Sequence, residues 1–195
     1  ATLRAAKGNV CLETGNVQGL ILAGLLFDAG EIKSDNLLVI GNEGQKSEDN
    51  GKNIYLSDLF FHVGGTDTDT PVSVKCCATI NSNHVVGDNF WVWRADHGDN
   101  VAWEKNEAEN GIIINGDDVT MYALMVEHFE QYQTVWNGDH GKVYMYQSEI
   151  PYDVPNQEVW MSHEGQKNGY ASFYVDDAVA VSYTHLRAHE TGAYL

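Results

Sequence analysis

The sequence Asn-Gly-Asp at residues 115–117 recurs at residues 137–139, an offset of 22. Asn, Gly and Asp favour tight turns between short strands. A period in the low twenties, with short strands meeting at such corners, is typical of the coil of a parallel β-helix. Successive coils of that fold stack about 4.8 Å apart, so residues one coil apart become neighbours on one sheet. The repeat therefore predicts stacked coils.

The same offset aligns side chains on both sides of the tripeptide. Tyr122 corresponds to Tyr144, and Glu127 corresponds to Glu149. Three large apolar residues also fall into one predicted column at this spacing: Val92, Ile114 and Trp136. We therefore expect the members of each set to project from neighbouring strands of one sheet.

Earlier turns of the chain fit the coil more loosely. The segments that begin at Gly24, Asp58 and Asn89 look equivalent, but they stand 34 and 31 residues apart. The extra residues fall in two polar loops, Gly41–Lys52 and Gly64–Pro71, which would bulge from coil corners. A β-sandwich or jelly roll also has many short strands, but neither predicts a fixed 22-residue column. We therefore predict an all-β fold, a partial single-stranded right-handed parallel β-helix of the pectin-lyase type.

The composition excludes several classes of protein. The 195 residues carry 11 Lys+Arg against 28 Asp+Glu, a formal net charge of −17. Nucleic acids and anionic membranes bind through clustered cations, so neither is an expected partner. The longest apolar run, residues 19–27, is shorter than the roughly 20 residues of a membrane-spanning helix. The three cysteines, Cys11, Cys76 and Cys77, have no metal-binding spacing, and we expect neither a metal nor a cofactor.

The two ends of the chain indicate part of a longer protein. Ala1 begins without a cleavable signal sequence, as a fragment would. Residues 182–195 have neither the coil period nor the acidic composition, and they resemble the translated adaptor sequence found at the ends of environmental gene fragments. We therefore assign residues 1–181 to the β-helix domain and residues 182–195 to a non-native tail.

Glu127 and Glu149 are the candidate catalytic pair. One coil apart, they are expected to project from the same face of one sheet and to lie close together. Two carboxyl groups that close favour a state in which one is ionised and the other is protonated. A glycosidase needs such a pair, with a protonated acid at the leaving oxygen and a carboxylate nearby. The alternative is a pair of solvated glutamates on an outer face.

Aromatic residues concentrate in the same part of the chain as the two glutamates. Sugar rings stack their C–H faces on aromatic rings, and their hydroxyl groups pair with polar side chains at the rim. Core packing is the alternative for about half of them, because alternate residues of a strand point inward. Trp136 is the first candidate for a sugar platform, with inward packing equally open. The set is Trp91, Trp93, Trp103, Trp136, Trp160, Tyr132, Tyr144, Tyr146 and Tyr152.

A dense polar cluster, residues 93–99 with the sequence Trp-Arg-Ala-Asp-His-Gly-Asp, follows one of the predicted strands. It could hold a hydroxyl-rich ligand, orient an acid, or brace a corner through an Asp–Arg or Asp–His pair. Its chemistry alone favours the brace.

Four motifs in order resemble glycoside hydrolase family 55, the β-helical exo-β-1,3-glucanases or laminarinases. They are Asn-Phe-Trp-Val-Trp-Arg-Ala-Asp-His-Gly at 89–98, Gly-Ile-Ile-Ile-Asn-Gly-Asp-Asp-Val-Thr at 111–120, Val-Glu-His-Phe-Glu-Gln-Tyr at 126–132, and Tyr-Gln-Ser-Glu-Ile-Pro-Tyr-Asp-Val-Pro-Asn-Gln at 146–157. The resemblance extends from about residue 15 to residue 179.

The resemblance implies two β-helices side by side, with the active site in the cleft between them. This chain would supply part of the second helix, and its partners would be a β-glucan chain and the missing N-terminal β-helix. The implied reaction is an inverting hydrolysis that releases glucose units from the non-reducing end of β-1,3-glucan. Such a polymeric substrate implies a secreted protein.

The resemblance also implies roles for single residues. Glu149 would be the general acid, and Glu127 would be the second active-site carboxylate, which helps to place the water or to tune the acid. Further residues are expected to contact the sugar: Trp136, Tyr152, Asp153, Asp96, His97, His128 and Gln147.

Two other functions stay open from the residues alone. A non-catalytic glycan-binding β-helix, such as a tailspike or adhesin module, would keep the aromatic residues but would not need two carboxylates one coil apart. A β-helical polysaccharide lyase acts on uronates, and a chain with a net charge of −17 is a poor host for a polyanion.

Overall fold

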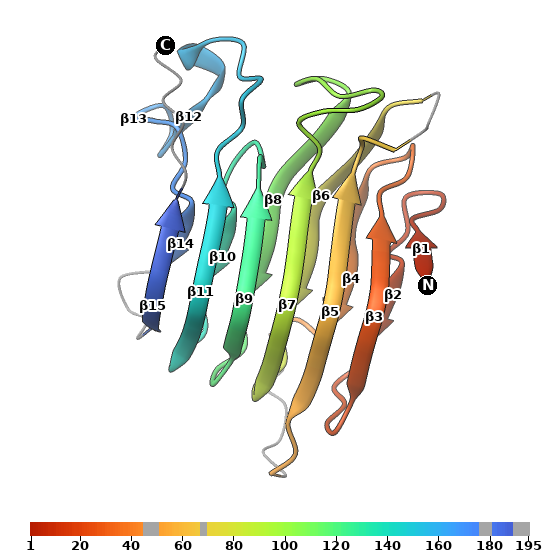
Figure 1. Ribbon diagram of the computed structural model, residues 1–195, viewed down its shortest axis with the longest axis vertical. Helices are drawn as coiled ribbons and strands as arrows, with labels where there is room; N and C mark the ends of the chain where they lie inside the picture. The colour runs from red at the N-terminus through yellow and green to blue at the C-terminus, as the bar shows by residue number, and fades with distance from the viewer. Residues whose placement is uncertain (45–50, 67–69, 176–180, 189–195) are drawn as a thin grey trace.

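The computed structural model describes residues 1–44, 51–66, 70–175 and 181–188. Over these ranges the chain forms a seven-stranded sheet, sheet A, and a six-stranded sheet, sheet B, together with a small two-stranded hairpin. Sheet A has the order β1-β3-β5-β7-β9-β11-β15, and sheet B has the order β14-β10-β8-β6-β4-β2. From β1 to β11 successive strands alternate between the two sheets, so each turn of the chain adds one strand to each (Figure 1). This is a parallel β-helix, and the predicted fold class is confirmed.

The strand bounds are as follows. Sheet A contains β1 (Thr2–Arg4), β3 (Ile21–Asp28), β5 (Ile54–Val63), β7 (Val85–Arg94), β9 (Thr120–Glu127), β11 (Gly141–Glu149) and β15 (Val181–Ala188). Sheet B contains β2 (Leu12–Thr14), β4 (Ser34–Ile40), β6 (Val72–Ile80), β8 (Asn106–Ile114), β10 (Thr134–Trp136) and β14 (Phe173–Val175). The 3-10 helix η1 (Gln157–Val159) precedes the antiparallel hairpin of β12 (Met161–Ser162) and β13 (Lys167–Asn168).

The register of the strands confirms most of the predicted columns. Tyr122 is paired with Tyr144 in the parallel ladder between β9 and β11. Ile114 is paired with Trp136 between β8 and β10. Val92 does not belong to that column, because it lies on β7 of sheet A, opposite Val126. The prediction failed there because the coil before the repeat is 34 residues long, as the pairing of residue 86 with residue 120 shows.

Side chains at the corners explain why Asn recurs at this spacing. Asn137 donates from Nδ2 to Oδ1 of Asn115 at 2.8 Å, and Asn115 donates in the same way to Asn81 at 2.8 Å. The amides therefore form a ladder that runs from coil to coil. On sheet A, Asp58 and Asn89 both have left-handed backbone conformations, with φ of 54° and 56°, and Asn89 donates to Asp58 at 2.7 Å. The predicted equivalence of these earlier turns is thus confirmed.

The core consists of the inward-pointing residues of both sheets. Phe27 and Phe61 stack with ring centroids 4.9 Å apart, and Val92 and Val126 continue the same row across sheet A. All four side chains are fully buried. Burial of each such side chain contributes about 1.5–3 kcal/mol, so this row holds neighbouring coils together. Within the described residues, no helix is long and apolar enough to cross a membrane.

Parts of two earlier predictions fall outside the described residues. The predicted corner loops include residues 45–50 and 67–69, which the structure does not describe. The predicted tail begins at residue 182, and its first seven residues belong to β15, which pairs in parallel with β11. Residues 189–195 lie outside the described ranges. The foreign origin of residues 182–195 stays a prediction.

Candidate active site

Glu127 and Glu149 are register partners at the carboxyl ends of β9 and β11. Both side chains point outward from sheet A, because their neighbours Val126 and Ser148 point into the coil. In Figure 1 the loops that follow β7 and β11 rise at this same end of the stack. The predicted juxtaposition of the two carboxylates is therefore present, at one end of sheet A and close to two long loops.

The two carboxylates have different hydrogen-bond partners. Oε2 of Glu127 accepts from the indole Nε1 of Trp91 at 2.9 Å. Oε2 of Glu149 accepts from the hydroxyl of Tyr152, and its Oε1 lies 3.4 Å from Nε2 of Gln147. The Glu149 side chain is 25% exposed, so it can still contact a ligand. Two neighbouring carboxylates in unequal surroundings can take the separate roles of acid and base.

His128 lies between Glu149 and the polar loop after β7. Its side chain is buried, and its Nδ1 is 3.1 Å from the carbonyl oxygen of Ile150. Its Nε2 is 3.7 Å from Oε2 of Glu149 and 3.8 Å from Oδ1 of Asp96. The backbone of His128 is left-handed, with φ of 68°, which turns the chain sharply just after Glu127. This residue therefore lies within 4 Å of both Glu149 and Asp96.

Asp96 and His97 form the outer part of the site. Oδ1 of Asp96 is 2.7 Å from Nδ1 of His97, whose side chain is 79% exposed. Partial burial of Asp96 favours its protonated form, but the hydrogen bond with His97 and the charge of His128 outweigh it and lower the pKa of Asp96. Asp96 therefore remains an ionised acceptor that could pair with a ligand hydroxyl.

A pair of tryptophans lies next to Glu127 on the outer face of sheet A. The rings of Trp91 and Trp93 stack with centroids 5.2 Å apart and planes 19° apart. His62, on the neighbouring strand, contacts both rings edge-on. Sequence reasoning named both tryptophans as aromatic candidates but did not include them among the site residues. The signal was available, since residues 91 and 93 alternate on the strand that ends in the polar cluster.

Trp136 is not a sugar platform in this structure, and that prediction was wrong. Its side chain is 0% exposed, and its ring stacks on Phe173 inside the coil. Gly141 gives it room, because a Cβ at that position would lie 2.4 Å from the indole nitrogen. The 22-residue offset identifies residues that share a column, but both faces of a strand have the same offset.

The polar cluster braces its corner, through a partner that the sequence did not indicate. Arg94, with 1% of its side chain exposed, pairs with Asp153, and Nη1 and Nη2 donate to the two carboxylate oxygens at 2.9 and 2.7 Å. Glu130 lies 3.5 Å from the same guanidinium. Burial raises the pKa of Glu130 to about 7, although Arg94 opposes the shift. The sugar contact expected of Asp153 stays a prediction, with Arg94 as its observed partner.

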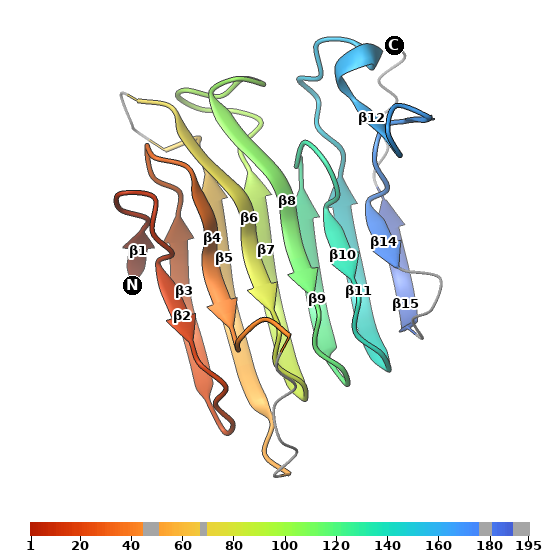
Figure 2. The same cartoon turned by 180° about the vertical axis from the view of Figure 1, so that it is seen from behind.

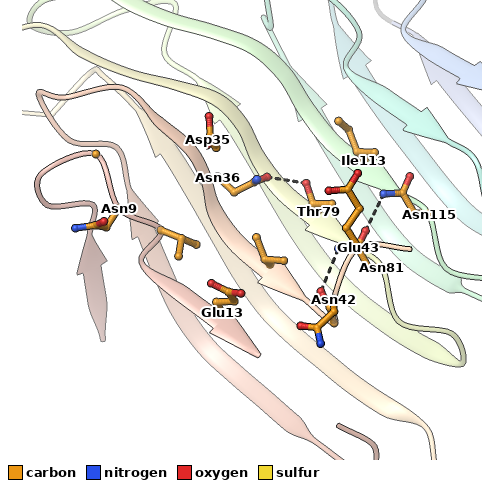
Figure 3. Close-up of a pocket in the computed structure, with 14 residues that line it drawn as sticks. Asn9, Glu13, Asp35, Asn36, Asn42, Glu43, Thr79, Asn81, Ile113 and Asn115 are labelled. Carbon is orange, nitrogen blue, oxygen red and sulfur yellow. Dashed lines mark hydrogen bonds between the residues drawn. The ribbon is translucent and has the colours of Figure 1, made fainter. Parts of the chain in front are cut away.

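A pocket of about 600 Å³ lies away from this site, on the outer face of sheet B (Figure 3). Much of its lining is polar and already hydrogen-bonded, since Thr79 donates to Asn36 at 2.6 Å and Asn115 donates to Asn81 at 2.8 Å. None of the predicted site residues lines this pocket. Across the described ranges, no group of three or more His, Cys, Asp or Glu side chains could hold a metal ion.

The alternating strands of two parallel sheets place the chain in the class of parallel β-helices. The model of the LAM55 pectate lyase-like domain matches residues 1–149, and the chain belongs to that family. The resemblance of its motifs to glycoside hydrolase family 55 is thereby confirmed.

Known relatives agree with this assignment. The chain is 39% identical over 179 residues to an exo-β-1,3-glucanase of Streptomyces sp. (strain SirexAA-E / ActE), covering 92% of this chain and 29% of the relative. The structure of sacteLam55A from Streptomyces sp. SirexAA-E matches with a TM-score of 0.86 and 38% identity, over 93% of this chain and 32% of that one. A variant of sacteLam55A in complex with glucose matches with the same TM-score and 37% identity, over 94% and 34%. This chain therefore spans about a third of the length of these relatives.

Proposed function

We propose that this chain is part of an exo-acting β-1,3-glucan hydrolase in which Glu149 is the general acid. The observation that carries the proposal is the register pairing of Glu127 with Glu149 on the outer face of sheet A, beside the stacked Trp91 and Trp93. The similarity to a named exo-β-1,3-glucanase supports the substrate class. The glucose complex of a similar structure supports a sugar ligand.

In the proposed reaction Glu149 protonates the glycosidic oxygen while water attacks the opposite face of the anomeric carbon. Inversion requires room for that water between the acid and the base. Glu127, which accepts a hydrogen bond from Trp91, can help to orient the water. His128 lies 3.7 Å from Glu149, and Asp96 lies 3.8 Å from His128. Both side chains would bind sugar hydroxyl groups or hold Glu149 in place.

The outer face of sheet A is the proposed contact surface for the rest of the parent protein, the predicted N-terminal β-helix. It exposes large apolar side chains on four strands: Ile21, Tyr55, Tyr122 and Tyr144. The relatives are about three times as long as this chain, so a comparable parent has ample chain to cover this face. Docking there would turn the end that carries Glu127 and Glu149 into a cleft. Secretion of the parent is proposed from the size of its substrate.

Product analysis tests the proposal directly. The full-length parent is incubated with laminarin, and the products are separated and followed by proton NMR during the first minutes. We expect glucose as the first product, released as the α-anomer because the β-linkage is inverted. Glucose that appears first as the β-anomer would refute only the inverting stereochemistry and would leave the proposed hydrolysis in place. An unsaturated product would indicate a lyase, and binding without products would indicate a glycan-binding module.

A further inference from the structure

The side chain of Arg94 lies beneath the candidate active site, where several segments of the chain meet. Its Nε donates to the carbonyl oxygen of Asn106 at 2.9 Å, and its Nη1 donates to the carbonyl oxygen of His128 at 3.2 Å. Its Nη2 donates to the carbonyl oxygen of Ala102 at 3.3 Å. Both terminal nitrogens bind Asp153. One buried guanidinium thus contacts the start of β8, the loop after β7, the corner after β9 and the loop after β11.

Two of these contacts connect directly to the proposed catalytic carboxylates. His128 follows Glu127, the last residue of β9, and Asp153 comes four residues after Glu149, the last residue of β11. The ladder between these strands ends with the bond from the backbone nitrogen of His128 to the carbonyl oxygen of Glu149, at 2.8 Å. Beyond that bond the His128 ring still contacts Ile150 and Tyr152, and the buried Arg94 side chain binds both segments, at the His128 carbonyl and at Asp153.

The segment held by Asp153 also carries a contact to the acid. Tyr152 donates its hydroxyl to Oε2 of Glu149, and its ring packs on His128 with centroids 4.7 Å apart. A bidentate bond from Arg94 to the adjacent Asp153 limits the motion of this segment, because two parallel N–H···O bonds restrict both position and orientation. The left-handed turn at His128 is restrained from the other side by the bond to its carbonyl oxygen.

Stability alone is a weak reason for this arrangement. Burial of an ion pair has a large desolvation cost, and apolar side chains of similar volume often stabilise a fold equally well. The planar guanidinium of arginine, with its five N–H donors, fixes the positions of its hydrogen-bond partners in a way that apolar packing does not. We propose that Arg94 is a positioning residue, which holds Glu149 and Glu127 in their reactive arrangement by binding Asp153 and the His128 carbonyl. This inference rests on the proposed glucan hydrolysis.

The test compares Arg94→Lys and Asp153→Asn with the wild type in the full-length parent. Lysine keeps the charge but loses the planar guanidinium, and asparagine keeps the shape of Asp153 but loses its charge. We expect kcat on laminarin to fall roughly 10- to 100-fold in each variant, because small displacements of reacting groups carry costs of this size. KM of Arg94→Lys should stay within about threefold, since the Arg94 side chain is buried and is not expected to touch the sugar. The double variant should lose no more than the worse single variant.

Asp35→Asn is the matched control for Asp153→Asn, since Asp35 pairs with Lys75 at 2.6 Å on the outer face of sheet B, away from the carboxylate pair. Its kcat should equal that of the wild type. Thermal unfolding of each variant sets an assay temperature at which all are folded. A folded Asp153→Asn protein with wild-type kcat would overturn the inference. If Arg94→Lys does not fold, the result for Asp153→Asn, the milder substitution, decides the test. A wild-type protein that releases no glucose would overturn the proposed function and this inference together.

Discussion

The outer faces of the two sheets belong to the same coils but differ in chemistry. Sheet A presents stacked tryptophans, exposed tyrosines and the paired glutamates. Sheet B presents ion pairs and hydrogen-bonded amides, such as Lys33 with Glu109 at 2.8 Å and Lys75 with Asp35 at 2.6 Å. The pocket of Figure 3 is on sheet B, whereas the carboxylate pair is on sheet A. Figure 1 views the molecule from the side of sheet A, and Figure 2 views it from the side of sheet B. The fold supplies both faces, and the side chains decide which of them can carry out chemistry.

The largest expected effect is a difference in kcat between a substitution on sheet A and one on sheet B. Glu149→Gln should lower kcat on laminarin about 10²- to 10⁴-fold, because the variant cannot donate a proton to the leaving oxygen. Glu13→Gln, which changes a glutamate in the sheet B pocket, is the control and should leave kcat unchanged. Initial rates of glucose release measure both. If Glu13→Gln proved to be the damaging change, the site would lie on sheet B.

The second prediction contrasts the inside of the coil with its outer face. Trp136→Ala should lower the free energy of unfolding by about 3–5 kcal/mol, because it leaves a large cavity in the core. Tyr144→Ala, which changes a 39% exposed ring on sheet A, should cost less than half as much. Urea denaturation of both variants provides the comparison. Equal losses would contradict the assignment of Trp136 to the core.

The third prediction concerns the hydrogen bond between Trp91 and Glu127. Trp91→Phe keeps an aromatic ring but removes the donor to the carboxylate, and hydrogen bonds to charged groups contribute about 1.5–3 kcal/mol. We expect kcat/KM to fall by at least about tenfold. Trp160→Phe removes a bond of the same length, 2.9 Å, from Trp160 to the carbonyl oxygen of Glu130, outside the carboxylate pair. It should leave kcat/KM near the wild-type value, and similar losses in the two variants would argue against a special role for Trp91.

The smallest expected effect is a pH dependence of stability that arises from Glu130. Its pKa is raised from 4.5 to about 7 in the folded protein, so the folded state binds this proton more tightly than the unfolded chain. The resulting stabilisation is complete below about pH 4.5 and is lost as the pH rises through 7, with a span of at most about 3 kcal/mol. The difference in stability between the wild type and Glu130→Gln, measured by denaturation from pH 5 to pH 8, should follow this curve. A difference that stays constant with pH would contradict it.

Local regularity made much of the fold predictable. The Asn-Gly-Asp repeat marks corners where amide ladders form, so a 22-residue offset was enough to place Glu127 beside Glu149. The column that included Val92 failed because coils of unequal length interrupt the period. The platform assigned to Trp136 failed because an offset does not distinguish the two faces of a strand.

The contact between Arg94 and Asp153 could not have been predicted in the same way. The two residues are 59 positions apart, and they meet only because the start of β8, the corner after β9 and the loops after β7 and β11 converge on one guanidinium. The amino-acid sequence by itself determined the coil period, the acidic surface and the register of the two glutamates, since these depend on local turns and on composition. The tertiary structure alone decided which side chains face outward and that Arg94 binds the segments after β9 and β11, because both depend on packing between distant segments.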